Sequence, residues 1–229
     1  MRFNTVAVLT LLLLLVASSF VSSDPLFKGS ESVPSDAIVL FDGEDLSNWV
    51  LCGTDKPLPW KLENGYMEIT SGNACSRQKF NDFQLHIEFW LPLMADAKGQ
   101  DRANSGVYLK GAYEIQVLDS YGLKSGHGDC GAMYGIAPPM VNACRPPEQW
   151  QSYDIVFHEP RFDENGVKTE NARVTVFHNG ALIHYNALFP AASRGAIAVE
   201  SSRPEPIFLQ DHGCPVRYRN IWVRPLPKS

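Results

Sequence analysis

The stretch from Asn104 to Asp119, NSGVYLKGAYEIQVLD, decides the fold class, because it has the pattern of two strands joined by a short polar turn. Side chains of a strand alternate between its two faces. In the second half, Glu114 and Gln116 share one face. The opposite face takes three apolar residues: Tyr113, Ile115 and Val117. The pattern predicts a sheet with one packed face and one polar face, which is either a solvated outer surface or a site.

Short strand patterns recur along the rest of the chain. They cover residues 37–41, 60–63, 66–69, 83–91, 151–158, 173–178, 181–185, 206–210 and 216–224. Two of the intervening turns are Asn-Gly, at Asn64-Gly65 and Asn179-Gly180, and this dipeptide is typical of tight β-hairpins. Beyond the N-terminus, we find no helical periodicity. Many short strands at this spacing predict an all-β sandwich of two antiparallel sheets.

The N-terminus has the pattern of a targeting segment. Arg2 precedes an apolar run over residues 6–16, and small residues follow up to Ser23. We expect a signal peptide over residues 1–23, a Ser- and Pro-rich leader over 24–35, and a single β-sandwich domain over 36–229. No other segment is apolar enough to cross a membrane. The expected location is therefore secreted or periplasmic, without a membrane anchor after removal of the signal.

The charge of the chain restricts its binding partners, and its cysteine content restricts the disulfides and metal sites that it can form. The chain has 20 basic and 25 acidic residues, and its Lys and Arg residues do not cluster, so nucleic acid is an unexpected partner. Export permits disulfides, but five cysteines leave at least one thiol unpaired within the chain. The sequence does not choose among the pairings, and the cysteine spacings do not match a zinc module.

The longest region without strand patterns runs from Ser120 to Glu148. It contains several glycines, two Pro-Pro pairs, and polar or aromatic residues such as Tyr134. A long connection without secondary structure in a small domain is usually functional or disordered. We expect this one to be a loop folded over one mouth of the sandwich.

Several fragments together resemble one family, the 3-keto-disaccharide hydrolase domain, which was formerly a domain of unknown function. The fragments, in the family's order, are LFDGEDLSNW (40–49), ANSGVYLKGAYEIQVLDSYG (103–122), CGAMYG (130–135), QWQSYDIVF (149–157), ARVTVFHNG (172–180) and PIFLQDHGCPVRYRNIWVRPL (206–226). The resemblance covers almost the whole chain after the leader. It implies a concanavalin A-like jelly-roll sandwich and an exported enzyme that acts on glycosides whose sugar ring carries a ketone at C3.

The implied chemistry differs from that of ordinary glycosidases. A C3 ketone acidifies the C2 proton, because the resulting carbanion is an enediolate. Loss of that proton lets the glycosidic oxygen leave C1 by elimination, and water then adds back. Such a site requires a base for the C2 proton, an acid for the leaving group, and a cation or donors at the C3 oxygen.

The candidate catalytic residues are Glu114 and His212. Glu114 is the first choice for base or metal ligand, with Gln116 as a hydrogen-bonding partner on the same strand face. His212 belongs to a Gln-Asp-His run at a strand end, and histidine is the best acid or base by its ordinary pKa, although an ordered loop histidine is the alternative. Alternation places Gln210 on the same polar side.

Further candidates would bind the substrate or a metal. Arg217 and Arg219 alternate with apolar residues and either pair with Glu114, polarise a sugar oxygen or form surface salt bridges. Asn104 would line the rim of the site, and Tyr134 would stack on a sugar face. Asp119 either binds a metal or caps a turn; with Glu114 it would suit calcium or magnesium.

Two other functions compete with this one. A non-catalytic, lectin-like carbohydrate-binding module would bind an oligosaccharide without turnover, and it needs aromatics and amides more than a glutamate with a histidine. An ordinary glycoside hydrolase on the same fold needs paired carboxylates. Here Gln116 occupies the place where a second acid along the strand would be expected.

Overall fold

The structure is a computed structural model that describes residues 33–227. The expected signal peptide, residues 1–23, and residues 24–32 of the expected leader lie outside the described residues, so both stay predictions. Within the described part of the chain, no helix combines the length and the apolar character needed to span a membrane.

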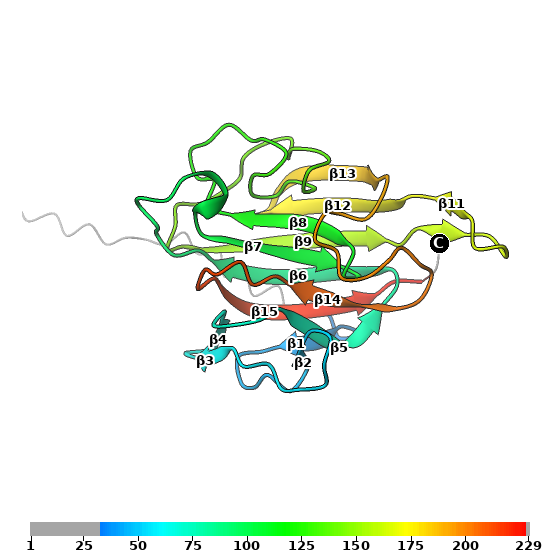
Figure 1. The fold of residues 1–229 in the computed structure, drawn as a ribbon, viewed down its shortest axis with the longest axis horizontal. Helices are drawn as coiled ribbons and strands as arrows, with labels where there is room; N and C mark the ends of the chain where they lie inside the picture. The colour runs from blue at the N-terminus through cyan, green and yellow to red at the C-terminus, as the bar shows by residue number, and fades with distance from the viewer. Residues whose placement is uncertain (1–32, 228–229) are drawn as a thin grey trace, which may run out of the picture. The chain divides into compact units, whose positions relative to one another are not determined.

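Strands account for nearly all of the regular structure (Figure 1). They are β1 (Ile38–Phe41), β2 (Trp49–Leu51), β3 (Lys61–Glu63), β4 (Tyr66–Glu68), β5 (Ala74–Phe80), β6 (Phe83–Trp90), β7 (Asn104–Leu109), β8 (Tyr113–Leu118), β9 (Trp150–His158), β10 (Arg161–Phe162), β11 (Lys168–Glu170), β12 (Ala172–His178), β13 (Ala181–Phe189), β14 (Glu205–Leu209) and β15 (Arg217–Pro225). A short 3₁₀ turn, η1 (Gly99–Asp101), precedes β7.

Two large sheets form the sandwich, and every strand pair in them is antiparallel. The first has the order β13-β12-β9-β6-β15-β4-β3, with β1 also paired to β15, and the second has the order β2-β5-β14-β7-β8. A two-stranded ribbon of β10 and β11 lies apart from both. The predicted all-β sandwich of two antiparallel sheets is confirmed.

The core lies between the inner faces of the two sheets. From the second sheet it takes the three residues that the alternation of β8 predicts to be apolar and inward: Tyr113, Ile115 and Val117. From the first sheet it takes alternate residues of β6, namely Phe83, Leu85, Ile87 and Phe89, each fully buried. Burial of such large side chains contributes about 1.5–3 kcal/mol each.

The two Asn-Gly pairs form the tight hairpins that the sequence predicts. Asn64 and Gly65 have φ of 48° and 78°, and Asn179 and Gly180 have φ of 51° and 80°. Positive φ at both central residues gives the turn whose twist matches that of the flanking strands. These turns join β3 to β4 and β12 to β13.

The long loop over residues 119–149 lies along β8, the edge strand of the second sheet. Gln116 of β8 exchanges backbone hydrogen bonds with it, donating to Ala132 and accepting from Gly131. The same loop reaches the other sheet, where the Met140 amide donates to Ile183 of β13 and His184 contacts the Gly131 carbonyl. The loop therefore bridges the edges of the two sheets, beside β8 in Figure 1.

Candidate active site

The candidate site is built on the β7–β8 hairpin, whose outer face is polar. Directly opposed residues of an antiparallel pair project from the same face. Tyr108 is opposite Glu114, and Gly106 is opposite Gln116. A Cβ atom at Gly106 would lie 2.5 Å from Glu114 Oε1, so any larger residue there would force the Glu114 carboxylate to shift.

Glu114 is a buried carboxylate without a cationic partner in the described structure. Its side chain is 2 % exposed, and its Oε2 atom has no hydrogen-bond partner among the described residues. Burial raises the pKa of Glu114 to about 7, and the Tyr108 hydroxyl opposes that rise. A carboxyl group with such a pKa exchanges its proton near neutral pH, which suits a general base.

An amide network holds the neighbouring polar groups. Gln116 donates through Nε2 to Gln100 Oε1 at 3.0 Å, and Asn104 donates to the Gln100 backbone carbonyl at 2.8 Å. Gln100 in turn donates to the Gly128 carbonyl at 2.8 Å. Asn104 Oδ1 is buried, and no donor to it is found among residues 33–227. Asn104 and Glu114 thus each have a buried acceptor atom without a donor among the described residues, and both line the same cavity. Such acceptors are expected where a ligand supplies the donors.

These groups surround a cavity of about 220 Å³. Its lining residues are Gln100, Asn104, Tyr108, Glu114, Gln116, Tyr134, Arg194, Gly195, Gln210 and His212. The structure thus brings together six of the nine residues predicted from the sequence: Asn104, Glu114, Gln116, Tyr134, Gln210 and His212.

The end of β14 brings two of these residues to the cavity. The Gln210 amide donates to the Gly106 carbonyl at 3.0 Å, and its own carbonyl accepts from Ser105 Oγ at 2.6 Å. Asp211 accepts from the backbone amides of Gly72 and Gly213, which fixes the turn that carries His212. His212 is exposed at the rim, so its imidazole reaches both the cavity and water.

Four lining residues were not predicted. Tyr108 lies on the polar face of β7 opposite Glu114. The alternation of side chains along β7 could have placed it on that face from the sequence. Its hydroxyl donates to the Arg194 carbonyl at 3.0 Å. Arg194 and Gly195 belong to the β13–β14 connection, and Gln100 to η1, where no strand pattern points to a site. Arg194 is exposed, and no ion pair to it is found within residues 33–227.

Arg217 and Arg219 are not brought to the cavity. Both lie on β15 in the other sheet, where Arg217 pairs with Glu68 and Arg219 with Glu88, each at 2.6 Å. Their guanidinium groups also lie over tryptophan rings, at 4.1 and 4.0 Å from the ring centroids. Both arginines therefore form salt bridges on the sheet surface, which was one of the alternatives expected from the sequence. Neither of them pairs with Glu114.

Asp119 does not have the contacts of a metal ligand. One of its oxygens accepts from Arg102 at 2.5 Å and the other from the Tyr121 amide at 3.3 Å. The cavity itself offers a single carboxylate, that of Glu114. Calcium takes 6–8 oxygen ligands, usually with several carboxylates. This donor set does not fit calcium, whereas magnesium, which proteins hold through one or two carboxylates, stays a prediction.

Comparison with known proteins identifies the family. Residues 36–224 match the family described as the 3-keto-alpha-glucoside-1,2-lyase-like domain. The chain belongs to this family. The match runs from before β1 to β15, so it includes every lining residue of the cavity. The resemblance inferred from the sequence fragments is confirmed.

Solved structures agree with that assignment. A "putative glycosyl hydrolase" from Parabacteroides distasonis is 38% identical, with 84% of each chain covered and a TM-score of 0.77. A second protein with the same description and organism is 18% identical, covers 84% of this chain and 94% of its own, and has a TM-score of 0.61; it shows the fold alone. The comparison with curated proteins gives no match.

Proposed function

We propose that the protein cleaves 3-keto-glycosides by removing the C2 proton, eliminating the C1 substituent and adding water. The observation that carries the proposal is the unpartnered, buried Oε2 atom of Glu114 in a cavity. Membership of a 3-keto-glucoside lyase-like family supports the substrate class. The 38% identical protein that is described as a "putative glycosyl hydrolase" supports action on a glycosidic bond.

Glu114 is the proposed base. The C2–H group next to a ketone is a weak carbon acid, so its deprotonation requires a reasonably strong base. A carboxylate whose conjugate acid has a pKa of about 7 is a stronger base than an ordinary carboxylate. Burial also removes the water that would otherwise solvate the carboxylate. The proton passes from C2 to Glu114 Oε2, and the electron pair of the C–H bond moves into the enediolate.

His212 and Arg194 are proposed to act on the two oxygens that become negatively charged. The Arg194 guanidinium would stabilise the C3 oxygen of the enediolate. His212 would protonate the glycosidic oxygen as the C1–O bond breaks, which releases the alcohol and leaves an enone. Addition of water across C1 and C2 then gives the free 3-keto sugar, so the net reaction is hydrolysis.

The size of the cavity fits one sugar ring. Its volume of about 220 Å³ is below the roughly 300–1,000 Å³ of pockets for drug-sized ligands. Tyr134 is half-buried at the cavity and offers a ring for stacking, and Asn104 and Gln116 offer amides. We place the keto sugar inside and the rest of an oligosaccharide outside, towards His212.

Aglycone release tests this function. The protein after removal of the signal would be incubated with a 3-keto-glucoside and with its unoxidised parent, each with and without EDTA. Release from the keto substrate alone supports elimination, and persistence in EDTA fits a site with one carboxylate. Release from neither substrate, with sugar binding intact by calorimetry, would favour the lectin-like module.

We also propose that the protein acts outside the cytoplasm, in a secreted or periplasmic form. The signal-peptide pattern and the disulfide between Cys52 and Cys75 support an oxidising compartment. Mass spectrometry of the protein recovered from its native cells should find a mature N-terminus near residue 24. An intact Met1 in a cytoplasmic fraction would contradict the proposal.

A further inference from the structure

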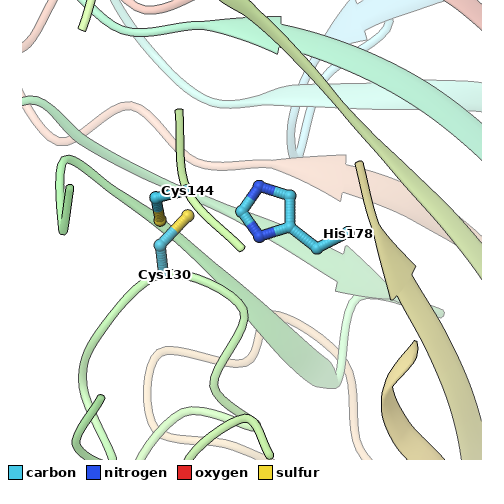
Figure 2. Close-up of side chains that lie close together, drawn as sticks. All are labelled: Cys130, Cys144 and His178. Atoms are coloured by element: carbon cyan, nitrogen blue, oxygen red, sulfur yellow. The ribbon is translucent and has the colours of Figure 1, made fainter. Parts of the chain in front are cut away.

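A second chemically distinctive group is formed by Cys130 and Cys144, in the loop over residues 119–149, and His178, at the end of β12. Their ligand atoms, two sulfurs and one ring nitrogen, all lie within 4.8 Å of one another. Figure 2 shows the edge of the His178 ring turned towards the two sulfurs. Cys130 and His178 are buried and Cys144 is half-buried.

The hydrogen bonds of Gln151 fix the tautomer of His178. The backbone N–H of Arg145 donates to Gln151 Oε1 at 2.9 Å, so that atom accepts. His178 Nε2 lies 2.9 Å from the same oxygen and therefore carries the hydrogen. The lone pair is left on Nδ1, for which no hydrogen bond is found within the described part of the chain.

This arrangement is the one that metal-binding histidines have in proteins. A ligating imidazole coordinates through one nitrogen and donates its other N–H to a carbonyl or carboxylate oxygen, which orients the ring. Two thiols beside it add soft ligands of the kind that zinc and copper(I) prefer. By contrast, the cavity around Glu114 offers oxygen and nitrogen ligands without sulfur.

We infer that Cys130, Cys144 and His178 bind one thiophilic metal ion, with zinc(II) as the first choice. Both thiols lose their protons to solvent as two sulfur–metal bonds form, so the ion's two positive charges are balanced by two thiolates. Three protein ligands leave the fourth tetrahedral position of zinc to an oxygen. The Tyr153 hydroxyl lies 3.1 Å from Cys130 Sγ and donates to the Gln116 carbonyl at 2.7 Å, so it links the cluster to β8.

The expected role of the ion is to fasten the long loop behind the candidate site. Cys130 and Cys144 both lie in the loop, and His178 ends β12. The residue after Cys130, Gly131, donates to the Gln116 carbonyl, and the Tyr134 amide donates to the Glu114 carbonyl. The ion would thus tie the sheet edge that carries Glu114 and Gln116 to the opposite sheet. The inference does not depend on the proposed reaction.

Cobalt(II) provides a direct test, because thiolate ligation gives it a near-ultraviolet charge-transfer absorption. The full-length folded protein would be reduced with a phosphine, freed of metal and titrated with cobalt(II), then with zinc(II). We expect one equivalent of cobalt to produce the thiolate band and one equivalent of zinc to abolish it. Cys130→Ser and Cys144→Ser should each lose the band.

Cys214 supplies the matched control, because it is a buried free cysteine outside the cluster. Cys214→Ser should keep the band and the stoichiometry. Gln151→Leu, which removes the acceptor of the Nε2 hydrogen, should weaken cobalt binding by about 10–100-fold without abolishing it. Circular dichroism on each variant shows that a lost band does not result from unfolding.

Two results would overturn the inference. One is a reduced wild-type protein that gives no thiolate band at micromolar cobalt, or a band that survives in the folded Cys144→Ser variant. The other is a disulfide between Cys130 and Cys144, found by non-reducing peptide mapping of the protein as isolated from its native cells. In that second case the pair would be a covalent fastener of the same loop.

Discussion

At the scale of the residue, Glu114 combines two properties that do not favour stability. It is buried, and its Oε2 atom has no partner among the described residues. An unsatisfied buried acceptor costs about 1–3 kcal/mol, so the folded protein retains this group at the expense of stability. Such conflicts between local stability and structure are expected where a site is functional.

Replacing Glu114 with glutamine keeps the shape and removes the base. We expect Glu114→Gln to lower kcat on a 3-keto-glucoside by about 10²–10⁴-fold, with a melting temperature equal to or above that of the wild type at pH 8. Glu170→Gln is the control, because Glu170 is an exposed carboxylate on β11 outside the cavity. This variant should leave kcat and the melting temperature unchanged. Steady-state kinetics and thermal unfolding measure the two effects, and near-wild-type turnover by Glu114→Gln would exclude this residue as the base.

The raised pKa of Glu114 also predicts how stability depends on pH. The folded-state value is about 7, against an ordinary value of 4.5, so the folded protein holds the proton more tightly than the unfolded chain. Stability from this group is therefore greatest below about pH 4.5 and falls as pH rises towards 7. At roughly 1.4 kcal/mol per pKa unit, the loss is about 3 kcal/mol. Urea unfolding of the wild type and Glu114→Gln across pH 4–8 should diverge in this direction; parallel curves would contradict the shift.

Strand alternation predicted which residues share the face of Glu114 but not which sheet they belong to. Gln116 and Gln210 lie on the expected face, and both line the cavity. Arg217 and Arg219 also alternate correctly, yet β15 lies in the other sheet. Periodicity along one strand carries no information on long-range pairing, so these two residues could not be placed from the sequence. Arg194 lacked even a periodic signal.

At the scale of the element, the β7–β8 hairpin is the scaffold of the candidate site. All six residues of each strand are buried, including the polar ones, because the loop over residues 119–149 and the β13–β14 connection cover the outer face. The sequence predicted both strands from their alternation. It did not predict β2, β5, β10 or β11. In β5 three consecutive residues, Arg77 to Lys79, are exposed, so burial along this strand does not alternate.

Gly106 gives a test of this scaffold. In Gly106→Ala the new Cβ would lie 2.5 Å from Glu114 Oε1 and 2.9 Å from the Tyr108 ring, so the carboxylate must move. Because proton transfer requires hydrogen-bonding distance, we expect kcat to fall by at least about 10-fold while the far-ultraviolet circular dichroism spectrum is retained. A fully active Gly106→Ala variant would mean that the position of Glu114 is not critical.

At the scale of the whole molecule, a buried ion pair joins the two sheets. Lys110, in the β7–β8 turn, pairs with Glu159, which follows β9, and both side chains are at most 3% exposed. Lys110 also donates to the Ser201 carbonyl at 3.1 Å. The Arg161 guanidinium lies beside Glu159 and Asp82, which extends the network to the β5–β6 turn. This pair could not be predicted from the sequence, because its partners are 49 residues apart.

Breaking this pair should be costly. Lys110→Met leaves the Glu159 carboxylate buried with less compensation, and we expect a loss of about 3–5 kcal/mol in the free energy of unfolding. The double variant Lys110→Met, Glu159→Leu should recover part of that loss, because neither charge then remains. Chemical denaturation of the two single variants and the double variant forms the cycle. Purely additive losses would show that the two charges do not interact.

In the proposed reaction the C2 proton leaves before the glycosidic bond breaks, and deuterium incorporation at C2 reports on that order. A 3-keto-glucoside would be cleaved in D₂O, and the released sugar examined by NMR against a sample without enzyme. We predict deuterium at C2 of the product with the wild type, and neither cleavage nor exchange above background with Glu114→Gln. Complete retention of the original hydrogen at C2, with no deuterium in the released sugar, would instead indicate direct displacement at C1 without removal of the C2 proton.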